Sequence, residues 1–105
     1  MTVVAEQHLT ERLRDLLDRQ AATLAARGVQ SISLVGSRAR GDSKPTSDID
    51  LLLDLAPDAT FDLVDLVTLK DDLASALDRK VDVLVKGGLR PYVAAAVERD
   101  ALRLI

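Results

Sequence analysis

The chain has 105 residues, with 14 lysines and arginines against 17 aspartates and glutamates, and a formal net charge of −3. This length predicts a single domain over residues 1–105, and an apolar content of 48% excludes a disordered chain. Because there is no cysteine and only one histidine, disulfides, thiolate metal sites and multi-histidine zinc sites are excluded. The slightly acidic charge balance argues against direct binding to nucleic acid through bulk positive charge.

Membrane segments are not expected either. No stretch approaches the roughly 20 uninterrupted apolar residues of a membrane-spanning helix, and the first residues lack the pattern of a signal peptide. We therefore expect a soluble cytoplasmic protein.

Hydrophobic spacing predicts the elements in the order helix, strand, strand, helix, strand, helix. The predicted helices cover about Glu6–Arg27, Phe61–Leu77 and Tyr92 to about Leu104. The predicted strands cover Ser31–Val35, Asp48–Leu55 and Lys80–Val85. In the last helix the residues expected to face inward are Val93, Ala96, Val97 and Ala101. Phe61 and Tyr92, the only aromatic residues, are expected to be core or interface anchors.

This order of elements favours an α/β (α+β) fold with a mixed sheet of about three to four strands backed by helices. The loop Gly36–Ser47 is too short for a full helical crossover between parallel strands. The first two strands are therefore either antiparallel neighbours, or the loop holds one helical turn.

Two aspartates lie at the start of the second predicted strand. Asp48 and Asp50 are two residues apart, so on a strand both point to one face, with Cβ atoms about 6–7 Å apart. Mutual repulsion, and the cost of burying either carboxylate unpaired, favour a divalent cation between them. Mg²⁺ is usually held by one or two carboxylates plus substrate phosphates. The alternative is a polar strand edge with both aspartates solvated.

Gly36 and Ser37 follow directly after the first predicted strand. A glycine lets the backbone approach a ligand closely, and a serine hydroxyl with adjacent N–H groups can bind phosphate oxygens. The alternative is an ordinary turn at the end of a strand. A Walker phosphate-binding loop is absent, because Asp42 stands where the lysine is required.

A third aspartate, Asp82, lies within the valine-rich third strand. If this strand pairs beside the second, Asp82 shares the face of Asp48 and Asp50. Three carboxylates would then suit two cations about 3.5–4 Å apart, as in two-metal phosphoryl-transfer sites. The alternative is an edge-strand aspartate that deters aggregation.

Taken together, these residues resemble the minimal nucleotidyltransferases (MNT) of the DNA-polymerase-beta-like superfamily. The family signature is Gly-Ser, ten intervening residues and then Asp-x-Asp. Here Gly36-Ser37 is followed by ten residues and then by Asp48-Ile49-Asp50. The segment Asp78–Asp82 resembles the family as well, and the likeness covers nearly the whole chain.

The resemblance implies a mixed sheet with helices packed on one side, and transfer of a nucleotidyl group, commonly AMP from ATP, to a hydroxyl. The carboxylates that match the family's metal-binding and catalytic positions are Asp48, Asp50 and Asp82, the last as a metal ligand or as the base that accepts a proton. Two Mg²⁺ ions are implied. The nucleotide-binding residues are expected to be Gly36, Ser37 and Arg38, with Arg40 and Lys44 near the phosphates or simply solvated.

With a single domain predicted, no second domain that binds an acceptor is expected. Small stand-alone members of the family are often antitoxins paired with a helical HEPN-domain toxin, and some adenylylate a tyrosine of that partner. The resemblance therefore implies a protein adenylyltransferase similar to MntA-type antitoxins. Two alternatives stay open: a non-catalytic antitoxin that neutralises its partner by occlusion, and a small-molecule nucleotidyltransferase. A homo-oligomer is also compatible with the sequence.

Overall fold

The computed structural model describes residues 2–41 and 48–105, with the backbone alone for residues 2–7, 37 and 38. Lys44 lies outside the described residues. The helices are α1 (Thr2–Ala26), α2 (Ser37–Arg40), α3 (Leu63–Leu77) and α4 (Pro91–Arg99), with a 3-10 turn η1 (Lys86–Gly88) before α4. The strands are β1 (Val29–Val35), β2 (Ile49–Leu55), β3 (Val81–Val85) and β4 (Leu102–Arg103).

The strands form one mixed sheet in the order β3-β2-β1-β4. Strand β2 is antiparallel to β1 and parallel to β3, and β4 is antiparallel to β1. The mixed sheet and the antiparallel pairing of the first two strands confirm the predictions. The loop between those strands also holds the helical turn α2, so both arrangements considered for it are present.

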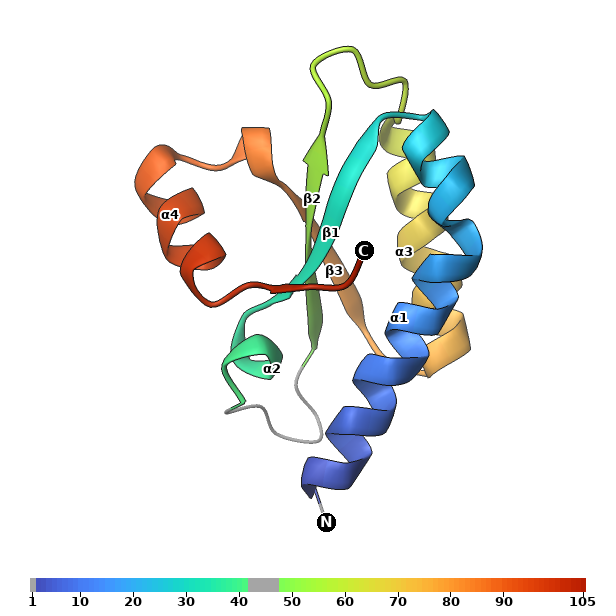
Figure 1. Ribbon diagram of the computed structural model, residues 1–105, viewed down its shortest axis with the longest axis vertical. Helices are drawn as coiled ribbons and strands as arrows, with labels where there is room; N and C mark the ends of the chain where they lie inside the picture. The colour runs from blue at the N-terminus through green and yellow to red at the C-terminus, as the bar shows by residue number, and fades with distance from the viewer. Residues whose placement is uncertain (1, 42–47) are drawn as a thin grey trace.

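The sheet separates the molecule into two unequal sides (Figure 1). Helices α1 and α3 cover one face, which confirms the prediction of helices packed on one side for the two long helices. Helix α4 lies beyond the opposite face and buries none of its residues. One face of the sheet is therefore the main core. The opposite face, which we call the open face, carries the buried Leu52 of β2 between the partly exposed Asp50 and Asp54.

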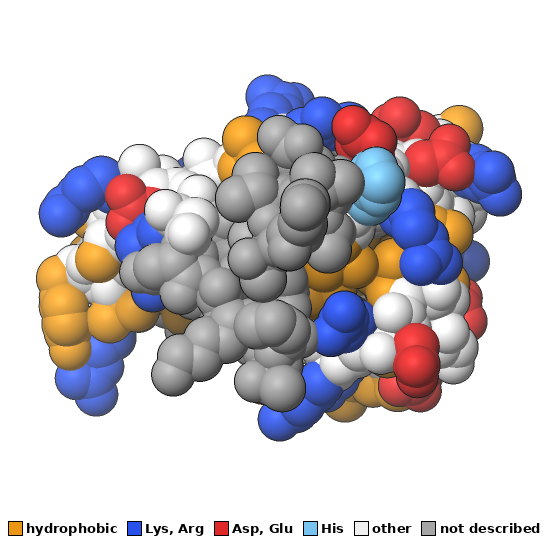
Figure 2. Space-filling model, turned by 90° about the horizontal axis from the view of Figure 1, so that it is seen from below, with side chains coloured by type: hydrophobic (Ala, Val, Ile, Leu, Met, Phe, Trp, Pro, Cys, Tyr) orange, Lys and Arg blue, Asp and Glu red, His pale blue; other side chains and the backbone are white. Residues whose placement is uncertain are grey.

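Charged side chains of both signs are interspersed on the surface. Figure 2 shows the end of the molecule near α2, where Lys and Arg side chains alternate with Asp and Glu around the residues drawn in grey. Among the described residues no helix is long and apolar enough to cross a bilayer.

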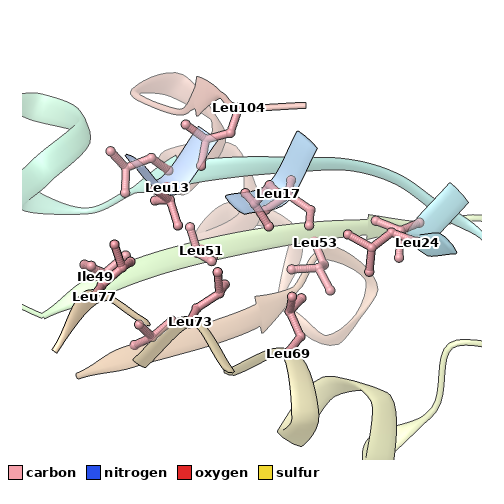
Figure 3. Close-up of a cluster of buried hydrophobic side chains, with 14 of the residues drawn as sticks. Leu13, Leu17, Leu24, Ile49, Leu51, Leu53, Leu69, Leu73, Leu77 and Leu104 are labelled. Atoms are coloured by element: carbon pink, nitrogen blue, oxygen red, sulfur yellow. The ribbon is translucent and has the colours of Figure 1, made fainter. Parts of the chain in front are cut away.

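The core consists mainly of leucine side chains, and it draws on α1, α3 and the strands β1, β2 and β3 (Figure 3). Among its buried residues are Leu13, Leu17 and Leu24 of α1, Ile49, Leu51 and Leu53 of β2, Leu69, Leu73 and Leu77 of α3, Ile32 and Leu34 of β1, and Val81 of β3. Since successive side chains of a strand point to opposite faces, the alternate residues Asp50 and Asp54 of β2 lie on the open face.

The start of α3 is tied to the end of α1. Asp62 is the N-cap: its carboxylate accepts a hydrogen bond from the backbone N–H of Asp65 at 2.9 Å. The Asp65 carboxylate accepts in return from the backbone N–H of Asp62 at 3.0 Å, which completes a capping box. The Arg27 guanidinium donates to both oxygens of Asp65, at 2.8 and 2.9 Å. These contacts hold the two core helices in register over the sheet.

The predicted last helix was too long. Helix α4 ends at Arg99, and Leu102–Arg103 form β4 against β1. The backbone N–H of Leu104 donates to the carbonyl of Ile32 at 2.9 Å, and the Leu104 side chain is buried. The chain is extended here because its backbone then forms hydrogen bonds with the otherwise unpaired edge of β1. The extended backbone also lets the Leu104 side chain enter the core.

The predicted burial of that helix was also wrong. None of Val93, Ala96 and Val97 is buried, and Ala101 lies beyond the end of α4. Tyr92 is 68% exposed, so it is not a core residue, whereas Phe61 is 8% exposed and lies in the core as expected. An apolar stripe at helical spacing marked the right element here without showing which surface it faces.

Truncation of one leucine in α3 should separate core from surface. Leu73 is 1% exposed and Leu63, on the same helix, is 74% exposed. We expect Leu73→Ala to lower the free energy of unfolding by about 2–5 kcal/mol, because it leaves a cavity in the core. The control Leu63→Ala should change it by no more than about 0.5 kcal/mol. Urea denaturation of both variants measures the difference, and equal losses would contradict the core described above.

The capping box predicts a pH dependence. The hydrogen bond from the Asp62 backbone N–H, followed by the Arg27 guanidinium, lowers the pKa of Asp65 below its ordinary value. A carboxylate with a lowered folded-state pKa stabilises the fold above its unfolded pKa, and this contribution disappears as the pH falls through the folded-state pKa.

We therefore expect Asp65→Asn to melt below the wild type at neutral pH, and the gap in Tm to narrow below about pH 4. Asp71→Asn, at an exposed position of the same helix, should melt close to the wild type throughout. Thermal melts at a series of pH values test this. A gap for Asp65→Asn that stays constant down to low pH would show that charge is not the cause.

Candidate active site

The end of β1 turns sharply into α2 at a glycine. Gly36 has a φ of +76°, a left-handed conformation that residues with a side chain rarely adopt. Its carbonyl accepts a hydrogen bond from the backbone N–H of Arg40 at 3.1 Å, which closes the single turn of α2. The strand end and the helical turn predicted at this position are therefore both present.

Gly36 also makes room for a carboxylate. In the antiparallel pairing of β1 and β2, Val35 lies opposite Asp50. A Cβ atom added to Gly36 would lie 2.7 Å from Oδ2 of Asp50, closer than side chains tolerate. The glycine thus leaves room for the Asp50 carboxylate, whose terminal oxygen would have to move if a side chain were present at position 36.

Asp50 and Asp82 are neighbours across the parallel pair β2 and β3. The register places Asp50 opposite Asp82 and Ile49 opposite Val81, on strands that lie about 4.8 Å apart. Ile49 and Val81 are fully buried in the core, so the two aspartates share the open face. The third predicted strand therefore pairs beside the second, as the expected position of Asp82 required. The chemical role of Asp82 stays a prediction.

Asp48 lies immediately before β2 and is partly exposed. Its Oδ2 is 3.6 Å from Nζ of Lys80, and its side chain is 41% exposed. Asp82 has a similar environment: Oδ1 is 3.8 Å from Nζ of Lys70, and the side chain is 40% exposed. Each of these two carboxylates thus has a lysine close by, although both ion pairs are long and open to water.

In the described part of the chain, no group of three His, Cys, Asp or Glu side chains is close enough to hold a metal ion by itself. The site therefore offers carboxylates on the open face, at the start of β2 and across β2 and β3, without a complete protein cage. Asp48, Asp50 and Asp82 therefore do not form a three-carboxylate metal cluster in this structure, and the binding of a cation by any of them stays a prediction.

The predicted phosphate-contacting residues beyond Gly36 are described only in part. The backbone of Ser37 and Arg38 lies in α2, directly after Gly36, and the roles of their side chains stay predictions. Arg40 is exposed at the end of α2.

A cavity of about 350 Å³ lies between α2 and α4 and was not foreseen from the sequence. Gly36 and Arg40 line one side, and the remaining lining residues are Tyr92, Val93, Ala96, Val97 and Asp100. The apolar spacing in α4 was visible in the sequence, but it indicated a buried face. Only the position of α4 away from the sheet shows that these residues line an open space.

Comparison with known proteins gives a consistent picture. A family model described as a nucleotidyltransferase domain matches residues 11–104. A Methanocaldococcus jannaschii protein named as a protein adenylyltransferase is 35% identical over 82 residues, which are 78% of this chain and 86% of that protein. The protein adenylyltransferase MntA of Thermococcus cleftensis is 30% identical over 93 residues, 88% of this chain and 92% of its own length.

Solved structures agree with the sequence relatives. A minimal nucleotidyltransferase superposes with a TM-score of 0.70 at 31% identity, over 89% of this chain and 93% of that one. A toxin–antitoxin structure with AMP-PNP gives a TM-score of 0.66 at 28% identity. The match covers 84% of this chain and 71% of the matched one. The complex of a tri-AMPylated Shewanella oneidensis HEPN toxin with its MNT antitoxin gives a TM-score of 0.65 at 25% identity. The match covers 95% of this chain and 71% of the matched one.

Three observations agree with one another. They are the fold, the strand register that brings Gly36, Asp50 and Asp82 together, and a family match over nearly the whole length of the chain. This chain belongs to the nucleotidyltransferase domain family and is a minimal nucleotidyltransferase.

Proposed function

We propose that this nucleotidyltransferase transfers AMP from ATP to a tyrosine hydroxyl of a helical HEPN-type toxin, and so acts as the antitoxin of a toxin–antitoxin pair. The observation that carries the chemistry is the register of Asp50 beside Asp82, with Gly36 against the Asp50 carboxylate. The similar solved complexes, one with AMP-PNP and one with an AMPylated HEPN toxin, support the nucleotide and the partner.

We assign the binding of Mg²⁺ to Asp48 and Asp50, with Asp82 as a third ligand or as the base. Their residue type fits a hard cation that prefers oxygen ligands. The nearby lysines Lys70 and Lys80 are no obstacle, because exposed ion pairs of this kind contribute only about 0–1 kcal/mol and are readily given up. When bound, Mg²⁺ neutralises phosphate charge and lowers the pKa of the acceptor hydroxyl.

The reaction is an in-line displacement at the α-phosphorus of ATP. The acceptor oxygen forms a bond to that phosphorus, and the bond to the oxygen bridging the α- and β-phosphates breaks, so that pyrophosphate leaves. We assign the hydroxyl proton to the Asp82 carboxylate and the binding of the leaving phosphates to Gly36, Ser37 and Arg38. In this scheme the chain supplies position and charge, and the partner supplies the nucleophile.

The carboxylates give a direct test. We expect Asp48→Asn and Asp50→Asn each to lower the transfer of α-labelled AMP from ATP by roughly 100-fold or more, since each removes a charge that the transition state needs. The matched control is Asp54→Asn, on the same face of β2 as Asp50 but paired with Lys86 at 3.9 Å; its transfer should stay within about twofold of the wild type.

Transfer is measured with a HEPN-type toxin, the proposed partner, as the acceptor. Full transfer by Asp50→Asn would end the mechanism. Binding is followed separately, because Mg-ATP at 100 times its Kd should stabilise the wild type by about 2.7 kcal/mol. No stabilisation, together with no transfer and intact binding of the partner, would favour an antitoxin that acts by occlusion.

The glycine gives a second test. Gly36→Ala should lower transfer by about 100-fold, because the new methyl group displaces the Asp50 carboxylate and misplacement by about 1 Å is enough for such a loss. Gly41→Ala is the matched control: its φ is +81°, so it has a similar backbone strain, but its Cβ would meet no atom of the described residues within 4 Å. Equal transfer by the two variants would show that the contact with Asp50 is unimportant.

A further inference from the structure

Helix α4 presents an apolar stripe to an open cavity. Val93, Ala96 and Val97 follow helical spacing along one side of α4, yet α4 buries none of its residues. Across the cavity of about 350 Å³ lie Gly36 and Arg40 of the α2 region. The stripe therefore lines a space large enough for a small ligand, at the lower end of the usual range for such sites.

This cavity is continuous with the proposed catalytic site. Gly36 lines the cavity, and Gly36 is also the residue against which the Asp50 carboxylate lies. A ligand whose phosphates lie at Gly36 and Asp50 therefore has this cavity as its nearest apolar space. The ligand of the proposed function has one part that is flat and apolar on both faces, namely its base.

We infer that the cavity between α2 and α4 is the subsite for the base of the nucleoside triphosphate. The inference rests on the proposed nucleotide binding and adds the place of the base. The aliphatic side chains of α4 contact one face of the base. Tyr92, which is 68% exposed at the cavity, supplies an aromatic ring for stacking. Asp100 provides an acceptor for an exocyclic amino group such as that of adenine.

Helix α4 has no buried residue, and Lys86 links it to the turn that precedes it. Nζ of Lys86, in the turn before α4, lies 2.8 Å from Oε1 of Glu98 in α4 and 3.9 Å from Oδ2 of Asp54 in β2. Hydrogen bonding to Glu98, and its charge, raise the pKa of Lys86. The 2.8 Å contact links α4 to the preceding turn and leaves the side that lines the cavity uncovered, whereas the 3.9 Å contact to Asp54 is long, partly exposed and of little energetic weight.

The test fills the cavity and compares a ligand that has a base with one that has none. Ala96 is exposed and lines the cavity, and its neighbour Ala95 is exposed but is not a lining residue. Affinities for Mg-ATP and for Mg-tripolyphosphate are measured by calorimetry on the wild type, Ala96→Phe and Ala95→Phe, with melting curves to confirm that all three fold.

We expect Ala96→Phe to lower the affinity for Mg-ATP by about 10- to 100-fold, the loss that follows removal of a base-stacking site. The affinity for Mg-tripolyphosphate should change by less than about twofold. Ala95→Phe should change neither affinity. Tyr92 is the only tyrosine and the chain has no tryptophan, so Mg-ATP should also quench the intrinsic fluorescence of the wild type, after correction for nucleotide absorption, whereas tripolyphosphate should not.

Other outcomes would overturn the inference. If Ala96→Phe leaves the affinity for Mg-ATP unchanged, the base lies elsewhere, and slowed transfer at unchanged affinity would assign the cavity to the acceptor. If Ala96→Phe lowers the affinities for Mg-ATP and Mg-tripolyphosphate equally, the defect is in the phosphate site. If the wild type binds neither ligand, the proposed function fails and the inference fails with it, which is a separate result from a failure of the base subsite alone.

Discussion

The register of β2 is the constraint on which the rest of the structure depends. One face of this strand is buried against α1 and α3 through Ile49, Leu51 and Leu53, and the other face carries Asp50 and Asp54 with Leu52 between them. A shift of one residue would turn the leucines to water and the carboxylates into the core, at a large cost in free energy. The packing that stabilises the fold therefore also holds Asp50 beside Asp82 and Gly36.

The two faces of the sheet divide stability from chemistry. The long helices cover one face, and a capping box with an Arg27–Asp65 ion pair fixes their ends. Helix α4 lies beyond the other face, linked by Lys86 to the turn that precedes it and without a buried side chain of its own. Because the main core lies on the side of α1 and α3, charged residues and the cavity beside α4 are accommodated on the other side without weakening that core.

Local patterns account for most of what was predictable. Helical spacing gave α1 and α3 to within a few residues, and short β-prone runs gave three of the four strands. The last strand was missed because Ala101 and Leu102 continue a helical pattern, while the free edge of β1 that recruits them is distant in the sequence. The same limit applies to Tyr92 and Val93, whose apolar character indicated burial but not the cavity they line.

The sequence by itself determined the chemistry available: a Gly-Ser turn, an Asp-x-Asp at a fixed distance from it, and a further aspartate in a valine-rich strand. It also determined the family, because that spacing is a local property of the chain. The tertiary structure alone decided that β3 lies parallel to β2 in the register that joins Asp50 to Asp82, that the glycine accommodates a carboxylate, and that α4 borders an open cavity. Strand pairing and helix placement are set by which surfaces can be buried together, and that depends on the whole chain rather than on any one segment.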